Sequence, residues 1–348
     1  MNFNTLLVKE LKKETSESVS ITFEIPTDLT KEYSFQAGQY ITIEKEINGE
    51  KVRRAYSIWK APFENEISVL VKKIDQGLFS TFANNDLKQT DQLSVSVPQG
   101  NFKLVASQGK TITLFSAGSG ITPILSIAKQ QLSLNDKNKV VLFYVNKTAS
   151  EIIFKNELSE LSEKYGERLI VHHLLTREES SENKFSGRIN TEKCQELFDS
   201  KALNINSDDF YMCGPEDMVI DIKDFLLNNK RNSDAIHFEL FTTSESSDVF
   251  ESKIDKATVF VTIDDDEFEY EYTIAESASL MDVGNDSGLD LPFSCKGGVC
   301  CTCKAKVMEG EAKMIKNYAL SDEEVAEGYI LTCQSHPTTE KLVISFDE

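Results

Sequence analysis

The nine residues CKGGVCCTC, positions 295–303, decide the fold of the last part of this chain, because they hold four of its seven cysteines. Cys295 and Cys300 enclose four residues, Cys300 and Cys303 enclose two, and Cys333 follows after a further twenty-nine. A C-x4-C-x2-C pattern with a distant fourth cysteine is the plant-type spacing for a [2Fe–2S] cluster. The spacing predicts that Cys295, Cys300, Cys303 and Cys333 are the ligands of such a cluster.

Three further residues of this loop bear on the hypothesis. Gly297 and Gly298 suit a loop that wraps two irons, because glycine tolerates positive φ and lets backbone N–H groups approach sulfur closely. Cys301 fits no position of the spacing, so we expect it to be a small buried apolar side chain. A zinc site, which prefers paired C-x2-C knuckles, and a chance cluster are the competing interpretations.

The sequence around the loop predicts strands and two short helices. ATVFVTIDDDEFEYEYTI, positions 257–274, is typical of a strand hairpin, and a short helix is expected at 279–285. Ser321 and Glu324 form a capping box and Gly328 is a stop signal, so a second helix should return the chain to the strand that carries Cys333.

Length and composition place the chain among globular proteins of more than one domain. Its 348 residues exceed one ordinary domain, and 40% are hydrophobic and 27% charged. The N-terminus has no apolar run of signal-peptide length, and no segment approaches the ~18–20 apolar residues that span a bilayer. We therefore expect a cytoplasmic protein with no membrane partner. Because that compartment is reducing, clustered cysteines there indicate metal binding or catalysis rather than disulfides.

The charge is strongly and regionally acidic. A net charge of −20 argues against nucleic acid and anionic membranes as partners, because their phosphates require a basic surface. Residues 257–348 hold 19 acidic against 6 basic residues and so carry −13 of the total. This acidity is either a solvated face or a docking surface for a basic partner, and charge alone does not choose between them.

The hydrophobic rhythm divides the rest of the chain. Residues 1–105 contain short alternating runs separated by turns, which predict an antiparallel β-barrel or sandwich. From Thr111 strands alternate with helices, and this alternation predicts a parallel sheet with helices on both faces over 106–240. Those helices are expected from Thr122, from about Ser150, near 190–198, and from Pro215 to about Asn228. A polar stretch, 241–256, is interpreted as a linker.

RRAYSIW, positions 53–59, combines residue types that suit a flavin site. Arg54 could neutralise a pyrophosphate, Tyr56 lies two residues on and so on the same strand face, and the Ser57 hydroxyl could hydrogen-bond a ring nitrogen. Trp59, the only tryptophan, is assigned to packing.

FSAGSGITPI, positions 115–124, predicts a phosphate-binding loop. A strand ends at Ala117 and a helix opens, with Thr122 as its cap and Pro123 as its first residue. Free N–H groups and the positive end of the helix dipole would then face an anion. The pattern, with Gly118 and Gly120, is G-x-G-x-x-P and departs from the G-x-G-x-x-G of a standard Rossmann domain.

Several of these motifs together resemble a known family. LPFSCKGGVCCTCKAKV (291–307), NYAL (317–320) and GYILTCQS (328–335) are similar to the ferredoxin domain in the reductase subunits of bacterial phenylacetyl-CoA epoxidases. RAYS (54–57), the glycine-rich loop and YMCGPEDM (211–218) resemble the flavin and nicotinamide domains of the ferredoxin-reductase superfamily. The resemblance runs from end to end. It implies an FAD-binding antiparallel β-barrel (1–105), an NAD(P)-binding α/β parallel-sheet domain (106–240), a linker (241–256) and an α+β β-grasp [2Fe–2S] ferredoxin domain (257–348).

The resemblance also implies roles for single residues, with Tyr56, Ser57, Cys213 and Glu239 at the catalytic centre. Arg54 would hold the FAD pyrophosphate, Tyr56 would pack on the isoalloxazine, and Ser57 would approach N5. Cys213 would lie beside the nicotinamide, Glu239 in HFELF would polarise or relay near N5, and Phe241 would shield the ring. Alternatively, Cys213 is only a buried thiol at a strand end. The other cofactor-binding residues implied are Val71, Lys72, Gly77 and Ser80 for the flavin phosphates, and Gly118, Gly120, Thr122, Pro123, Gly214 and Pro215 for the dinucleotide.

Two basic residues bear on the choice of coenzyme. Lys147 and Arg177 follow the next two strands of the predicted sheet, where the adenosine end of a dinucleotide would lie. Either could pair with a 2′-phosphate, which favours NADPH and leaves NADH open. Surface solvation is the alternative explanation for both residues and also for Lys72.

The function implied by the resemblance is electron transfer from NAD(P)H through FAD and the [2Fe–2S] cluster to an oxygenase component. A hydride delivers two electrons to the flavin, and the cluster carries them on one at a time. The acceptor implied is the di-iron oxygenase that epoxidises phenylacetyl-CoA in phenylacetate catabolism. The alternatives are the reductase of another oxygenase or of a hybrid-cluster protein, a flavin reductase or diaphorase with an incidental cluster, and a non-catalytic redox-sensing or scaffold module.

Overall fold

The computed structural model describes residues 3–105, 109–178, 185–242, 254–273 and 278–348. The chain forms two compact units, one within Asn2–Thr242 and the other within Thr243–Glu348. No helix in the described part of the chain is long and apolar enough to cross a membrane. Most of the predicted linker, 241–256, lies outside the described residues. At its two ends a strand runs to Thr242 and another begins at Lys256.

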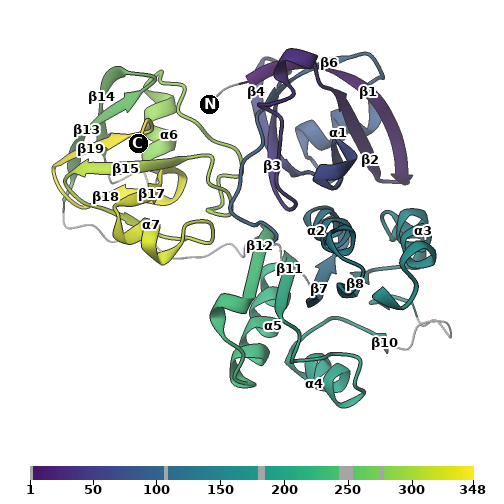
Figure 1. The fold of residues 1–348 in the computed structure, drawn as a ribbon. Coiled ribbons are helices and arrows are strands. Elements are labelled where there is room, and N and C mark those ends of the chain that lie inside the picture. Colours follow the sequence, from purple (N-terminus) through teal and green to yellow (C-terminus); the bar gives the residue numbers. More distant parts are fainter. Residues whose placement is uncertain (1–2, 106–108, 179–184, 243–253, 274–277) are drawn as a thin grey trace. The chain divides into compact units, whose positions relative to one another are not determined.

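The first unit begins with an antiparallel barrel, as the alternating runs predict (Figure 1). Its strands are β1 (Phe3–Thr15), β2 (Ser18–Glu24), β3 (Tyr40–Ile47), β4 (Glu50–Ser57), β5 (Ile67–Lys72) and β6 (Gln92–Ser96), in the order β4-β3-β6-β1-β2-β5. An antiparallel bridge between Ile58 and Val69 joins the two ends of this order. Alternate residues such as Ile41 and Ile43 are fully buried in the barrel, and α1 (Leu78–Asn85) packs Phe79 and Ala83 against the same core.

The same unit continues into a six-stranded parallel sheet, in the order β10-β9-β8-β7-β11-β12. The strands are β7 (Thr111–Ala117), β8 (Lys139–Asn146), β9 (Leu169–Leu175), β10 (Phe185–Ser186), β11 (Asp209–Pro215) and β12 (Ile236–Thr242). Helices α2 (Ile121–Leu134) and α3 (Lys155–Tyr165) lie on one face, and α4 (Thr191–Asp199) and α5 (Glu216–Asn228) on the other (Figure 1). This confirms the predicted parallel sheet with helices on both faces.

One helix start differs from the prediction. The helix expected from about Ser150 begins at Lys155, after a short 3₁₀ turn at Ala149–Glu151. Phe154 separates the two because its φ of 58° lies in the left-handed region, which interrupts a right-handed helix. The buried Phe154 ring packs against Trp59 of the barrel, with ring centroids 4.5 Å apart. This tertiary contact has no signature in the helical periodicity.

The second unit has a mixed five-stranded sheet in the order β14-β13-β19-β15-β17, with a two-stranded ladder of β16 and β18. The strands are β13 (Lys256–Ile263), β14 (Asp266–Thr273), β15 (Lys304–Glu309), β16 (Ala312–Met314), β17 (Tyr329–Leu331), β18 (Ser335–Pro337) and β19 (Lys341–Ser345). The first and last strands, β13 and β19, pair in parallel, which together with the helices gives the predicted α+β β-grasp arrangement. The two short helices are α6 (Leu280–Asp286), capped by Ser279, and α7 (Asp322–Ala326), which has the predicted Ser321–Glu324 capping box.

Candidate functional site

Residues from four strands meet where the barrel adjoins the parallel sheet. Cys213 on β11 stands in register with Ser116 on β7 and with Glu239 on β12, so the three side chains lie on one face of the sheet. From β4 of the barrel, the Ser57 hydroxyl donates to Oε2 of Glu239 at 3.4 Å. The structure therefore brings together Ser57, Cys213 and Glu239, which the sequence groups only by resemblance.

The electrostatics of this group favour neutral thiol and hydroxyl side chains. Burial raises the pKa of the Cys213 thiol well above its usual value, and the Glu239 charge raises it further. Cys213 is therefore a neutral thiol here, not a thiolate nucleophile. Ser116 is fully buried, and among the described residues its hydroxyl has no hydrogen-bond partner. Ser116 was not among the predicted site residues, although a serine two residues before Gly118 was the available signal.

The glycine-rich loop lies directly against the end of β11. Gly118–Gly120 forms a 3₁₀ turn, and α2 starts at Ile121 with Gly120 as its N-cap. A Cβ atom on Gly120 would lie 2.3 Å from the Cys213 carbonyl oxygen, so only glycine allows this approach. The loop is held from the other side by Tyr144, whose hydroxyl donates to the Gly118 carbonyl at 3.0 Å. Tyr144 was not anticipated, since its partner is a backbone atom 26 residues away.

Two details of the predicted helix start were wrong. Thr122 is not the N-cap and Pro123 is not the first helical residue, because the helix begins two residues earlier than Pro123, at Ile121. Both lie in the first turn, and the Thr122 hydroxyl donates to the Ser119 carbonyl at 3.0 Å. The 3₁₀ turn before the helix has already placed Gly120 in right-handed helical geometry, which moves the helix start forward. The loop still presents its N–H groups at a helix N-terminus, which fits a phosphate.

The barrel side of the site is built on β4. Arg54 is exposed, Tyr56 is half-buried and Ser57 is buried. The ring centroids of Tyr56 and Phe79 are 5.6 Å apart. Burial raises the pKa of Tyr56, so its phenol is neutral. Arg53 is buried in an ion pair with Glu44 (2.6 Å), which leaves Arg54 as the arginine exposed at the surface of this strand. This arrangement fits a flavin cofactor that binds against Tyr56 with its phosphates near Arg54.

The predicted flavin-phosphate segment forms a tight turn before α1. The Ser80 hydroxyl accepts from the Ile74 amide (3.2 Å) and donates to the Gly77 carbonyl (3.3 Å). Val71 is fully buried in the barrel core, so only its backbone is available to a ligand. Its carbonyl accepts from Asn84 at 3.1 Å.

Lys72 reaches from the barrel toward the glycine-rich loop. A Cβ built on Gly118, whose φ is +53°, would lie 3.9 Å from Nζ of Lys72. An ammonium at this place could pair with an anionic ligand bound at the loop.

The remaining predicted site residues lie near the carboxyl ends of β11 and β12. Gly214 is buried, and a Cβ there would come within 2.7 Å of Met218 and 3.2 Å of Ala117. Pro215 is exposed at the N-cap of α5, and Phe241 is half-buried against the core of the parallel-sheet domain.

Lys147 and Arg177 are brought side by side by the sheet. Both are exposed, and the Arg177 amide donates to the Lys147 carbonyl at 2.9 Å. The two cations therefore lie at the ends of neighbouring strands, as expected from the sequence.

The four predicted ligand cysteines converge in the second unit. Cys300, Cys303 and Cys333 are buried and Cys295 is half-buried, and the Sγ atoms of Cys295 and Cys300 are 3.1 Å apart. Hydrogen bonds from the Cys300 and Cys333 thiols and from the Gly297 amide lower the pKa of Cys295. Cys333 also contacts Cys303. Within the described residues, no group of three or more His, Cys, Asp and Glu side chains is placed so that it could hold one metal ion. Four converging thiols at this spacing, with backbone N–H donors, fit a binuclear cluster.

Cys301 bonds a different partner from the neighbouring ligand cysteines. Its thiol donates to the Ala319 carbonyl at 3.5 Å, and the side chain packs against the apolar core of the second unit. It is half-buried, so the expectation of a buried side chain was only partly right. The hydrogen bond to Ala319 lies outside the ligand group, as the spacing predicts.

Three family models match successive parts of the chain. Residues 6–104 match the model described as an oxidoreductase FAD-binding domain, residues 114–224 an oxidoreductase NAD-binding domain, and residues 261–338 a 2Fe-2S iron-sulfur cluster binding domain. The chain is 36% identical to a subunit of the 1,2-phenylacetyl-CoA epoxidase of Escherichia coli (strain K12), covering 99% of this chain and 98% of the relative. It is 32% identical to the ferredoxin reductase component of 3-ketosteroid-9-alpha-monooxygenase from Rhodococcus rhodochrous, covering 98% and 96%. The solved structure of phthalate dioxygenase reductase shares the fold, with a TM-score of 0.61, 23% identity and 99% and 98% coverage.

Proposed function

The chain belongs to the family of oxygenase reductase components that contain FAD, a nicotinamide-binding domain and a [2Fe–2S] cluster, and from this premise we propose that its acceptor is the oxygenase of a phenylacetyl-CoA epoxidase. The enzyme is an oxidoreductase that takes electrons from a nicotinamide coenzyme. The support for this particular acceptor is the 36% identity to a subunit of such an epoxidase over nearly the whole of both chains. The relative from Rhodococcus rhodochrous, at 32%, serves a different oxygenase.

The proximity of Ser57, Cys213 and Glu239 is the main structural support for the reductase mechanism. Bound FAD would supply the chemistry that couples a two-electron hydride donor to a one-electron acceptor. Glu239 accepts from the Ser57 hydroxyl at 3.4 Å and so orients it. The neutral Cys213 thiol, fully buried beside the glycine-rich loop, supplies a dry polarizable surface from which water is excluded.

The phosphates of the two cofactors have separate candidate partners. We propose that Arg54 and the turn at Gly77–Ser80 hold the flavin phosphates, because one supplies a guanidinium and the other a helix N-terminus. The loop Gly118–Gly120 would hold the nicotinamide dinucleotide. Lys147 and Arg177 would hold a 2′-phosphate, which makes NADPH the preferred coenzyme.

The acidity of the second unit supports a docking role. Asp322, Glu323 and Glu327 are exposed on or beside α7, which packs on β17, the strand that leads to Cys333. Redox partners commonly use small charged interfaces, so we propose that the acceptor presents a basic surface here. Acceptor reduction should then slow as ionic strength rises, whereas flavin reduction by the coenzyme should not.

The deciding experiment mixes the reduced enzyme anaerobically with purified acceptors. NADPH-dependent reduction of the epoxidase oxygenase should exceed that of other oxygenases and of a hybrid-cluster protein, and failure to reduce the epoxidase oxygenase would reject this acceptor. The variant Cys303→Ser serves as control. It should keep flavin reduction and lose acceptor reduction, whereas unchanged acceptor turnover would indicate a flavin reductase with an incidental cluster.

A further inference from the structure

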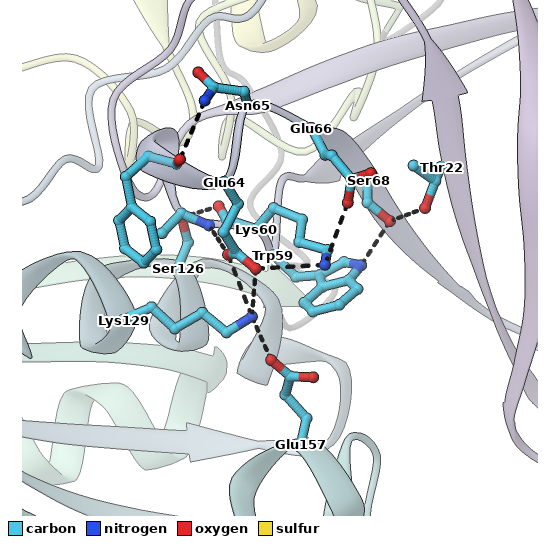
Figure 2. A network of polar contacts seen from close by, with 12 residues as sticks. Thr22, Trp59, Lys60, Glu64, Asn65, Glu66, Ser68, Ser126, Lys129 and Glu157 are labelled. Atoms are coloured by element: carbon cyan, nitrogen blue, oxygen red, sulfur yellow. Dashed lines mark hydrogen bonds and ion pairs between the residues drawn. The ribbon is translucent and has the colours of Figure 1, made fainter. Parts of the chain in front are cut away.

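Lys129 in the middle of α2 is a charged residue with only 2% of its surface exposed. Its ammonium lies 2.6 Å from Oε1 of Glu157 on α3 and 3.3 Å from Oε2 of Glu64 in the 3₁₀ turn Pro62–Glu64 of the barrel (Figure 2). Burial of a cation is unfavourable unless it is paired. One partner belongs to the parallel-sheet domain and the other to the barrel, so full pairing of Lys129 requires the two domains to be docked.

The only tryptophan of the chain completes this arrangement. Nζ of Lys129 lies 4.4 Å and Nζ of Lys60 lies 4.5 Å from the centroid of the Trp59 ring, within the range of cation–π attraction. The indole N–H donates to the Ser68 hydroxyl at 2.9 Å, which fixes the ring within the barrel (Figure 2). Trp59 is only 6% exposed, so these interactions are little screened by water. The role expected for Trp59 from the sequence was packing alone.

Further bonds hold the same segment of the barrel to α2. The Ser126 hydroxyl donates to the Lys60 carbonyl at 2.6 Å. Glu64 is itself fixed, because its Oε2 accepts from the Ala61 amide at 2.6 Å and its Oε1 pairs with Lys60 at 3.4 Å. Helix α2 therefore contacts residues 59–64 through a backbone carbonyl, an ion pair and an aromatic ring.

This network adjoins both sides of the candidate site, the flavin side at Ser57 and the nicotinamide side at the glycine-rich loop. Trp59 follows Ser57 by two residues, and α2 begins immediately after Gly118–Gly120. A helix and a paired strand are rigid over such distances, so a shift at Lys129 displaces the glycine-rich loop relative to Ser57. We propose that Lys129 and Trp59 are positioning residues that set the distance between the flavin side and the nicotinamide side for hydride transfer.

This inference rests on the proposed reductase mechanism and adds a prediction about the rate of flavin reduction. Hydride transfer requires the donor and acceptor atoms at near-contact distance, and a misplacement of about 1 Å can lower the rate about 100-fold. A contact that only stabilised the fold would change the melting temperature without a specific loss of hydride transfer in the folded enzyme. The rate of flavin reduction at saturating coenzyme therefore separates the two roles.

The test compares Lys129→Met with Lys129→Arg, and with Lys137→Met as a matched control on an exposed lysine in the turn after α2. Flavin reduction is followed anaerobically by stopped-flow absorbance at saturating NADPH, alongside FAD content and thermal unfolding. Lys129→Met should reduce flavin about 10- to 100-fold more slowly while it keeps its FAD. Lys129→Arg should recover most of the rate, because arginine retains both the charge and the cation–π contact. Lys137→Met should match the parent.

Each possible result of this test either supports or overturns the proposed positioning role. A folded, FAD-replete Lys129→Met enzyme with the parental rate of flavin reduction would overturn it. If that variant loses FAD or does not fold, the milder changes Ser126→Ala and Glu157→Gln take its place, each expected to slow flavin reduction by several-fold with FAD retained. Parental rates in both would equally overturn it. Failure of the parent enzyme itself to reduce its flavin with NADPH or NADH would instead reject the proposed function.

Discussion

Replacement of Gly120 by alanine tests the contact between the glycine-rich loop and the end of β11. An added Cβ would lie 2.3 Å from the Cys213 carbonyl oxygen, 2.7 Å from its carbon and 3.2 Å from the Gly214 nitrogen. All three are backbone atoms in a central strand, so no flexible side chain can move aside. Since ordinary contact begins at 3.4 Å, the loop must retreat by about 1 Å.

The magnitude follows from this displacement. Overpacking of this kind costs about 1–3 kcal/mol, and a domain of this size loses roughly 2–4 °C in melting temperature per kcal/mol, so a fall of about 2–12 °C is expected. The loop carries the proposed phosphate contacts, and a shift of about 1 Å should slow hydride transfer about 100-fold. FAD content should be unchanged, because the proposed flavin-binding residues lie mainly in the barrel.

The assay is anaerobic flavin reduction over a range of NADPH concentrations, with Ser133→Ala as control. That change truncates an exposed serine near the far end of α2, away from the glycine-rich loop and from β11, so its rate should stay close to that of the parent. The reasoning fails if Gly120→Ala keeps both the parental melting temperature and the parental reduction rate. It also fails if Ser133→Ala is impaired to the same degree.

Three other predictions concern the cluster, the coenzyme and pH. Cys301→Ala should keep the visible absorbance of the cluster and Cys300→Ala should bleach or destabilise it, whereas equal loss in both would contradict the ligand assignment. Joint replacement of Lys147 and Arg177 by alanine should lower kcat/KM for NADPH about 10- to 100-fold and change that for NADH little, since each cation would bond the 2′-phosphate. Parallel losses with the two coenzymes would count against this. Burial lowers the pKa of His336 below its ordinary 6.5, so the neutral form stabilises the second unit above pH 6.5 and this stabilisation is lost as the pH falls through the lowered pKa. His336→Asn should flatten the dependence of the melting temperature on pH below 6.5, and an unchanged profile would show that another group titrates.

The sequence alone determined the order and type of the domains and the candidate ligand cysteines. The barrel, the parallel sheet and the β-grasp unit each depend on alternation or helical periodicity, which is local in the chain. The cluster hypothesis rests on the spacing of Cys295, Cys300 and Cys303, and a single loop enforces that spacing. Ser321 and Glu324 formed the predicted capping box for the same reason, since its two bonds join residues three apart.

Only the tertiary structure decided how the two halves of the reaction site are held together. Ser57 and Glu239 are 182 residues apart in the chain, and no periodicity relates them. Lys129 reads as an ordinary helix lysine until folding buries it between Glu64 and Glu157. The physical reason is that spacing and periodicity report on neighbours along the chain. A buried cation, a glycine against a distant carbonyl and a hydroxyl facing a carboxylate depend on which surfaces meet once the chain has folded.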